Sequence, residues 1–202
     1  DGGEMYAVYD YLMYNQNNSD NTEKEYPYTA TDENCSPKKH ISKALLKNYT
    51  TLTINESKMK EALFEVGPLS VGVDANQDWQ LYKSGIYNPT PDQCSSSIED
   101  QDHGVAIVGY GIENNISYWI IRNSWGTDWG ENGYMRLVMG SNACGIANSV
   151  IYPIVAKSNH DQTKLNALEP ASQAAAAQKA AEEEKAARKA AEAALAVAAA
   201  LS

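Results

Sequence analysis

The residues of this sequence best suited to catalysis are a histidine and an asparagine that flank two apolar runs. His103 precedes the run 104–110, and Asn123 follows the run 118–122. An amide oxygen beside an imidazole can accept one ring N–H and so fix the tautomer. The other ring nitrogen can then exchange a proton with a thiol and generate a thiolate nucleophile. The residue types therefore predict acid–base chemistry, provided that the two side chains meet in the fold.

The two apolar runs predict a β-hairpin that brings these side chains together. Residues 104–110 are bounded by glycines, and residues 118–122 follow the turn-forming pair Asn114 and Asn115. When consecutive antiparallel strands pair through a short turn, the first strand starts beside the end of the second. The histidine and the asparagine are therefore expected at the same end of the hairpin. A single His–Asn pair without further context would be a structural hydrogen bond.

The remaining segments predict a mixed helical and extended fold. Apolar residues recur at helical spacing in residues 5–14 and 59–66, and residues 78–83 suit a short helix. Residues 53–56 match a capping box before the second helix, and residues 67–68, Gly-Pro, end it. Strands are predicted at residues 69–73, 104–110, 118–122, 133–138 and 150–155. The pattern indicates the α+β class, with a small antiparallel sheet or barrel.

Composition separates the chain into a globular part and a low-complexity tail. Residues 171–202 are mainly Ala, Glu, Lys, Arg and Gln, which favours a solvated helix without a coiled-coil stripe. Residues 157–170 are polar and are predicted to be a linker. Acidic and basic residues are equal in number from Lys157 onward, so residues 1–156 carry the net charge of −10. An acidic globular part without a Lys/Arg cluster is not expected to bind nucleic acid.

No membrane span, metal site or cofactor site is predicted. The Ala-rich end is too weakly hydrophobic to cross a bilayer. His40 and His160 have no partner residue at the spacing that metal ligands require. The chain opens without the basic and apolar stretches of a signal peptide, and this predicts an interior piece of a longer product.

Cysteines and glycosylation triplets leave two questions open. Cys35, Cys94 and Cys144 are an odd number, which predicts one disulfide and one leftover thiol. Five Asn-x-Ser/Thr triplets are possible N-glycosylation acceptors, and the sequence does not decide whether any is used. The triplets begin at Asn17, Asn34, Asn48, Asn55 and Asn115.

Longer stretches around the histidine and the asparagine resemble a known family. Residues 101–111, Gln-Asp-His-Gly-Val-Ala-Ile-Val-Gly-Tyr-Gly, resemble the His motif of papain-like cysteine peptidases. Residues 118–134 are similar to that family's Asn motif nearly residue for residue. Shorter matches follow in order and with the right gaps at residues 2–5, 26–28, 84–87, 144–147 and 152–153. The cathepsin L-like branch is the best fit.

The resemblance implies a fold and a set of roles. The fold would be a partial papain-like one, with a remnant of the helical left domain and a β-rich, barrel-like right domain. His103 would be the general acid and base, Asn123 would orient its ring, and Trp125 would shield their contact from water. The substrate would lie along Gly3, Met5, Ala75, Gln101, Asp102 and Ser149, with Gly3 offering its backbone.

Three further expectations concern neighbours of this site. Asp102 could be read as a third acid, but adjacent strand residues point to opposite faces, so a structural role is preferred. Trp119 and Trp129 are expected in the core rather than at a ligand. The resemblance pairs Cys94 with Cys144 and gives Cys35 a partner upstream of this sequence.

The family's nucleophile is the main departure from the pattern. In papain-like peptidases the catalytic Cys precedes the His by about 130 residues, which places it before residue 1. The oxyanion-hole Gln belongs to the same stretch. Residues 1–156 are therefore expected to be an N-terminally truncated peptidase domain that is inactive alone.

The resemblance implies that the parent protein hydrolyses peptide bonds by a Cys–His–Asn mechanism without a cofactor. Its expected partners are peptide or protein substrates, a propeptide and cystatin-like inhibitors. The expected surroundings are a lysosome or vacuole, or the extracellular space, which a disulfide supports. The alternative is a catalytically inactive homologue that binds peptides or partners.

Overall fold

The computed structural model describes residues 2–16, 20–31, 34, 45–52 and 54–156. The predicted linker and Ala-rich helix, residues 157–202, lie outside these ranges. The helices are α1 (Met5–Asn15), α2 (Glu56–Val66) and α3 (Gln77–Leu81), with short 3₁₀ turns η1 (Ile98–Asp100) and η2 (Ala143–Gly145). The strands are β1 (Leu45–Leu52), β2 (Leu69–Val73), β3 (Ile86–Tyr87), β4 (His103–Glu113), β5 (Ile116–Arg122), β6 (Tyr134–Val138) and β7 (Val150–Ala156).

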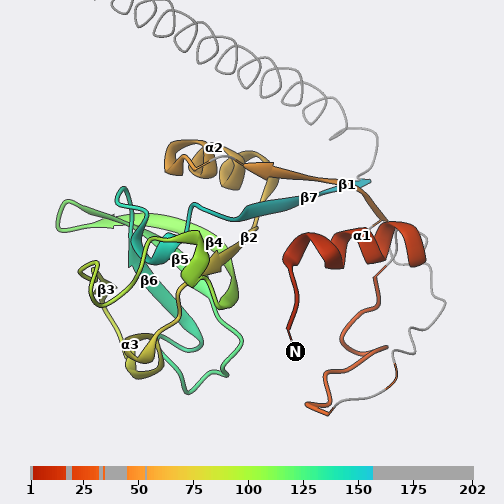
Figure 1. Cartoon of the computed structure of the whole chain (residues 1–202), viewed down its shortest axis with the longest axis horizontal. Helices are drawn as coiled ribbons and strands as arrows, with labels where there is room; N and C mark the ends of the chain where they lie inside the picture. The colour runs from red at the N-terminus through yellow and green to blue at the C-terminus, as the bar shows by residue number, and fades with distance from the viewer. Residues whose placement is uncertain (1, 17–19, 32–33, 35–44, 53, 157–202) are drawn as a thin grey trace, which may run out of the picture. The chain divides into compact units, whose positions relative to one another are not determined.

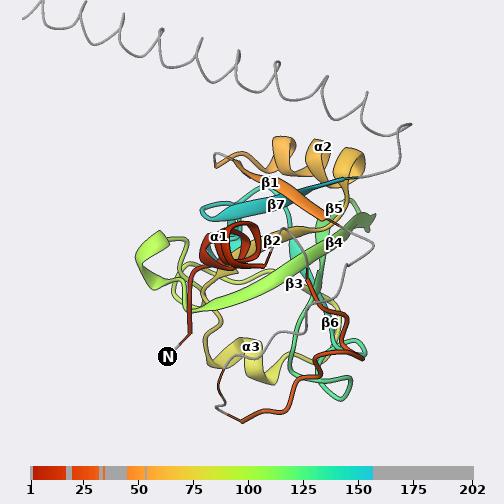
Figure 2. The ribbon, with the colours of Figure 1, turned by 90° about the vertical axis from the view of Figure 1, so that its right-hand side faces the viewer.

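The described strands form one sheet of seven in the order β1-β7-β2-β4-β5-β6-β3. All neighbouring pairs are antiparallel except β3 and β6, which run parallel. Figure 1 and Figure 2 show α2 and α3 at opposite ends of this sheet. The predicted strands are all present, and the fold is α+β as expected.

Strand β1 was not predicted, and its irregularity explains why. It pairs with β7, and the register shifts between Leu46 and Asn48. Lys47 and Asn48 occupy this irregularity and interrupt the alternation of apolar and polar residues on which strand prediction depends. The strand is defined by its partner, which lies about a hundred residues further along the chain.

The β4–β5 hairpin forms as predicted. Asn114 and Asn115 connect the strands with φ values of +50° and +63°. Asn tolerates this left-handed region, and two such residues in succession make the tight turn that suits twisted antiparallel strands. The hairpin therefore places the start of β4 and the end of β5 at one end of the sheet, as the site requires.

The helix α2 begins differently from the predicted capping box. Asn55 is the N-cap, and its side-chain oxygen accepts a hydrogen bond from the Lys58 backbone N–H at 3.0 Å. The predicted box has its cap at Thr53, which lies outside the described residues, whereas the described N-cap is Asn55 and the Glu56 carboxylate is bound elsewhere. It accepts hydrogen bonds from the Trp119 indole at 2.8 Å and from the backbone N–H groups of Gly140 and Asn142. The capping-box prediction is wrong because the helix is capped by Asn55, two residues later than the box predicts, and the Glu56 carboxylate is used in this long-range site.

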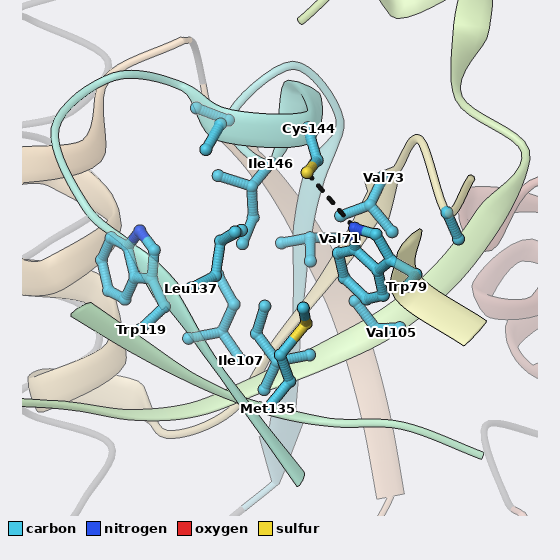
Figure 3. Packing of buried hydrophobic residues seen from close by; sticks show 14 of the residues in the cluster. Val71, Val73, Trp79, Val105, Ile107, Trp119, Met135, Leu137, Cys144 and Ile146 are labelled. Carbon is cyan, nitrogen blue, oxygen red and sulfur yellow. Dashed lines mark hydrogen bonds between the residues drawn. The ribbon is translucent and has the colours of Figure 1, made fainter. Parts of the chain in front are cut away.

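The hydrophobic core lies between the sheet and the elements that cover it. Figure 3 shows side chains from β2, β4, β6, α3, η2 and the residue after η2 converging there: Val71, Val73, Trp79, Val105, Ile107, Met135, Leu137, Cys144 and Ile146. The Trp79 indole N–H donates a hydrogen bond to the Cys144 sulfur at 3.3 Å. Cys144 also forms a disulfide with Cys94, so the loop before η1 is tied covalently to the core. Trp119 and Trp129 are buried, as predicted.

Candidate active site

His103 and Asn123 meet at one end of the hairpin. His103 is the first residue of β4, Asn123 directly follows β5, and the His103 Nε2 lies 2.8 Å from the Asn123 Oδ1. An amide oxygen only accepts hydrogen bonds, so this contact assigns the ring proton to Nε2. The Nδ1 of His103 is then the nitrogen available to take and return a proton. Asn123 is 9% exposed, and this burial keeps water from competing for its oxygen.

A row of aromatic side chains supports the histidine. The Trp125 ring stacks on His103 with centroids 4.9 Å apart, and it meets Trp129 edge-on at 5.3 Å. The Trp129 indole N–H in turn donates to the Trp79 carbonyl at 2.8 Å. Because Trp79 and Trp129 are buried, this row connects the half-buried His103 ring to the hydrophobic core. Sequence reasoning placed Trp125 here but did not find the supporting role of Trp79 and Trp129.

The loop after Asn123 is held by backbone contacts that require glycine. The Asn123 N–H donates to the Gly133 carbonyl at 3.0 Å, and the Gly133 N–H donates to the Trp129 carbonyl at 2.7 Å. Gly133 has a φ of +90°, and a Cβ there would lie 3.2 Å from the Gly126 carbonyl oxygen. A larger residue is therefore disfavoured both by conformation and by space.

An ion pair fixes the far side of the same loop. The Arg136 guanidinium donates to both oxygens of the Glu131 carboxylate, at 2.7 and 2.9 Å, and the Gly85 N–H donates to it at 2.9 Å. These hydrogen bonds, those from Arg136 first, hold the pKa of Glu131 below its usual range. Burial raises the pKa of the neighbouring Tyr82 hydroxyl, which donates to the Gly85 carbonyl at 2.6 Å. No local pattern in the sequence links this pair to Tyr82 and Gly85, which lie 54 and 46 residues before their partners in the cluster.

Four of the predicted substrate-contacting residues gather around one end of β2. The Gln101 amide donates to the carbonyls of Gly72 and Gly145, both at 2.8 Å. The Gly72 N–H donates to the Ser149 carbonyl at 3.0 Å. The Asp102 carboxylate accepts a hydrogen bond from the Ala75 N–H at 2.9 Å.

These bonds bear on the two interpretations of Asp102. Its carboxylate is used to hold the segment after β2, and this agrees with a structural role rather than with that of a third catalytic acid. The Gln101 side chain is likewise engaged with backbone carbonyls. Contact with substrate stays a prediction for these residues.

The other two predicted contacts, Gly3 and Met5, lie at the start of α1. In the part of the chain that the structure describes, neither shares a hydrogen bond or ring contact with the His103 group. The helix instead meets the sheet through Tyr9, whose hydroxyl lies 2.9 Å from the Ser70 hydroxyl and whose ring stacks on Tyr49. Gly3 is exposed, as an extended backbone partner would need to be.

The described part of the chain contains neither a free cysteine thiol nor a group of metal ligands. Cys94 and Cys144 form the disulfide that the family resemblance implied, and Cys35 lies outside the described ranges. Among the residues that the structure describes, no three His, Cys, Asp or Glu side chains gather as metal ligands would. The geometry therefore supplies a proton-transfer pair, whose ring nitrogen could serve a thiol contributed from elsewhere.

Residues 1–154 match the family model described as papain family cysteine protease. The chain belongs to the papain family. It is 41% identical to the oryzain gamma chain of Oryza sativa subsp. japonica over 156 residues, which cover 77% of this chain and 42% of that protein. It is 40% identical to cathepsin L of Sarcophaga peregrina, covering 76% of this chain and 45% of that protein. A pro-cathepsin H of Mus musculus is 38% identical.

Solved structures show the same papain-family fold. Digestive procathepsin L 3 of Tenebrio molitor larval midgut gives a TM-score of 0.69 at 37% identity, covering 76% of this chain and 49% of that one. Bromelain of Ananas comosus in complex with the inhibitor E64 gives a TM-score of 0.66 at 35% identity, covering 75% and 69%. The papain-like fold and the family predicted from the motifs are thus confirmed.

The chain spans less than half the length of the curated relatives that it matches. None of the helices in the described ranges is long and apolar enough to cross a membrane.

Proposed function

We propose that the protein containing this chain is a cysteine endopeptidase in which His103 transfers protons and Asn123 orients its ring. The observation that carries the proposal is the 2.8 Å contact between the His103 Nε2 and the Asn123 Oδ1, covered by the Trp125 ring. This contact leaves Nδ1 as the reactive nitrogen. Membership of the papain family supports the same assignment.

The chemistry follows from the position of that nitrogen. A cysteine thiol gives its proton to His103 Nδ1, and the resulting thiolate attacks the carbonyl carbon of the scissile peptide bond. The imidazolium then protonates the leaving amine, and an acyl-enzyme remains. A water molecule attacks the acyl carbon while His103 takes its proton, and the thiol is released. The proposed nucleophile is a cysteine about 130 residues before His103, outside this sequence.

Substrate recognition is proposed for the residues that the family resemblance singles out. Gly3 would pair its backbone with an extended peptide, and Met5, Ala75, Gln101, Asp102 and Ser149 would lie along the bound chain. A propeptide is a further proposed partner, because two of the similar structures are named procathepsins. Cystatin-like inhibitors are proposed on the family resemblance alone.

A lysosomal, vacuolar or extracellular location is proposed for the mature protein. The Cys94–Cys144 disulfide supports it, since disulfides persist in oxidising compartments. The relative from Tenebrio molitor is named a digestive protein of the larval midgut, which is compatible with export.

The test is a cleavage assay with an internally quenched peptide blocked at both ends, so that only an endopeptidase releases signal. The protein carrying this chain is expected to cleave it, and His103→Ala is expected to lower kcat/KM by at least about 100-fold. A matched exposed variant, Lys58→Ala, is expected to keep the activity. Tight binding of the peptide without cleavage would instead support the inactive, peptide-binding homologue.

A further inference from the structure

The tip of the β4–β5 hairpin carries one of the five Asn-x-Ser/Thr triplets. Asn115 occupies the second turn position, Ile116 begins β5, and Ser117 is the third member of the triplet. Three triplets lie wholly in the described part of the chain, beginning at Asn48, Asn55 and Asn115. The structure gives these three asparagines different surroundings.

Two of the three asparagines use their side chains locally. The Asn55 side-chain oxygen caps α2 through the Lys58 N–H at 3.0 Å, and the next residue, Glu56, is bound against β5. The Asn48 side-chain oxygen accepts from the Tyr49 N–H at 2.9 Å, within the irregular part of β1. A bulky group on either amide would have to be accommodated beside a helix cap or an edge strand. All three asparagines are exposed, but only Asn115 lies on a hairpin turn, where a bulky group extends into solvent without meeting a helix cap or a strand edge.

The hairpin tip also exposes more apolar surface than its polar turn suggests. Ile112 is 69% exposed and Ile116 is 41% exposed, and they flank Asn115 on the two strands. Ile112 lies opposite Ser117 and Ile116 lies opposite Glu113, so the two isoleucines point to opposite faces of the hairpin. Asn115 lies in the turn that joins the two strands, three residues after Ile112 and one residue before Ile116.

The tip is far from the catalytic pair. His103 and Glu113 are the two ends of β4, an 11-residue strand, so they lie about 30 Å apart at the usual rise per residue. A bulky group at Asn115 therefore leaves the histidine and its aromatic row unobstructed.

From these observations we propose that Asn115 is an N-glycosylation site whose glycan covers the apolar tip of the β4–β5 hairpin. The donor is a lipid-linked oligosaccharide in the secretory lumen. The Asn115 Nδ2 bonds to C1 of the first sugar, the bond from C1 to the lipid pyrophosphate breaks, and the amide loses one proton. The pyrophosphate keeps the electron pair, so nothing is oxidised or reduced. The proposal rests on the export proposed above but not on peptidase activity.

The experiment directs the full protein to the secretory lumen of a eukaryotic host and maps glycans by peptide mass spectrometry. Enzymatic release in ¹⁸O-water converts a glycosylated Asn into labelled Asp. The label is expected at position 115. Recovery of the peptide containing residue 115 only in its unmodified form would overturn the proposal, whether or not the protein cleaves peptides.

Matched variants distinguish the effect of losing the glycosylation triplet from the effect of changing the turn conformation. Asn114 and Asn115 share the left-handed conformation, and glycine suits both positions, but only Asn115 has a hydroxyl residue two positions later. Asn115→Gly and Ser117→Ala are expected to lower the apparent mass on a gel by one glycan. Asn114→Gly and Ser117→Thr are expected to leave the apparent mass unchanged. Loss of the glycan in Asn114→Gly, or its retention in Asn115→Gly, would contradict the assignment.

The covering role has its own readout. Asn115→Gly is expected to bind more of an apolar fluorescent dye than Asn114→Gly, and Ile112→Ser with Ile116→Ser is expected to cancel the increase. Equal dye binding by the two glycine variants would show that the glycan does not cover the tip.

Discussion

At the scale of single residues, the site depends on one hydrogen bond that selects the reactive nitrogen of His103. The bond could be predicted from sequence because both partners belong to one hairpin, and a hairpin fixes which strand ends meet. The stacking of Trp125 on His103 follows from the same local segment. The contacts of Trp125 with Trp129, and of Trp129 with Trp79, could not be predicted. Both residues were expected to be buried, but burial alone does not show which core residues pack behind the site.

The orienting role of Asn123 gives the first prediction. Asn123→Ala removes a hydrogen bond that holds the imidazole in one tautomer and orientation, a contact worth about 1.5–3 kcal/mol when one partner is charged. We therefore expect kcat to fall about 10- to 100-fold in the full protein with KM little changed. The measurement is steady-state cleavage of a fluorogenic peptide. Unchanged kcat, or a loss confined to KM, would show that Asn123 does not orient the base.

At the scale of elements, several segments are positioned by contacts that no local pattern contains. The strand β1 is defined by its partner β7, and the start of α2 is defined by a carboxylate site on β5 and the loop before η2. The sequence predicts that a helix begins near residue 55. It does not predict that the Glu56 carboxylate accepts a hydrogen bond from Trp119 instead of capping the helix. Long-range partners of this kind explain why the cap of α2 was predicted incorrectly and why strand β1 was not predicted.

Glu56 therefore gives the second prediction. Its carboxylate accepts three hydrogen bonds, from the Trp119 indole and two backbone N–H groups, and Glu56→Gln replaces one oxygen by a donor. We expect the free energy of unfolding to fall by about 2–3 kcal/mol. The control on the same helix is Glu61→Gln, which breaks an exposed pair with Lys58 and is expected to cost less than about 1 kcal/mol. Equal losses for the two variants, measured by urea unfolding, would contradict this account of α2.

The Glu131–Arg136 pair gives the third prediction, a pH dependence. The pKa of Glu131 is lowered from 4.5 in the folded protein, chiefly by hydrogen bonds from Arg136, so the unfolded chain binds more protons in the acid range. The stabilisation from this pair is therefore complete above about pH 4.5 and is lost as the pH falls through the folded pKa. Urea midpoints measured from pH 3 to 7 are expected to show a shallower acid decline for Glu131→Gln. Parallel curves for the variant and the parent would rule out this contribution.

At the scale of the whole molecule, one covalent bond closes a long loop through the core. Cys94 and Cys144 are 50 residues apart, and a loop of that length corresponds to about 4 kcal/mol of stabilisation from the restricted unfolded chain. The fourth prediction is that Cys94→Ser with Cys144→Ser lowers the free energy of unfolding by roughly that amount. A loss below about 1 kcal/mol in denaturant titration would contradict it.

The family, the fold and the disulfide pairing could be predicted from sequence because the motifs that indicate them are long and contiguous. The segments around His103 and Asn123 identified the family, and the family implied both the fold and the Cys94–Cys144 pairing. The cysteine count alone predicted a pair without naming it. The cluster around Glu131 and Arg136 could not be foreseen, because Tyr82, Gly85 and Glu113 join it from segments 23 to 54 residues away.

The most direct test of the central claim is covalent labelling of the full protein with E64, the inhibitor bound to the related bromelain structure. We predict that the label maps to one cysteine about 130 residues before His103 and that His103→Ala abolishes labelling while Lys58→Ala does not. Absence of labelling, or labelling that survives His103→Ala, would contradict the proposal that this histidine activates a catalytic thiol.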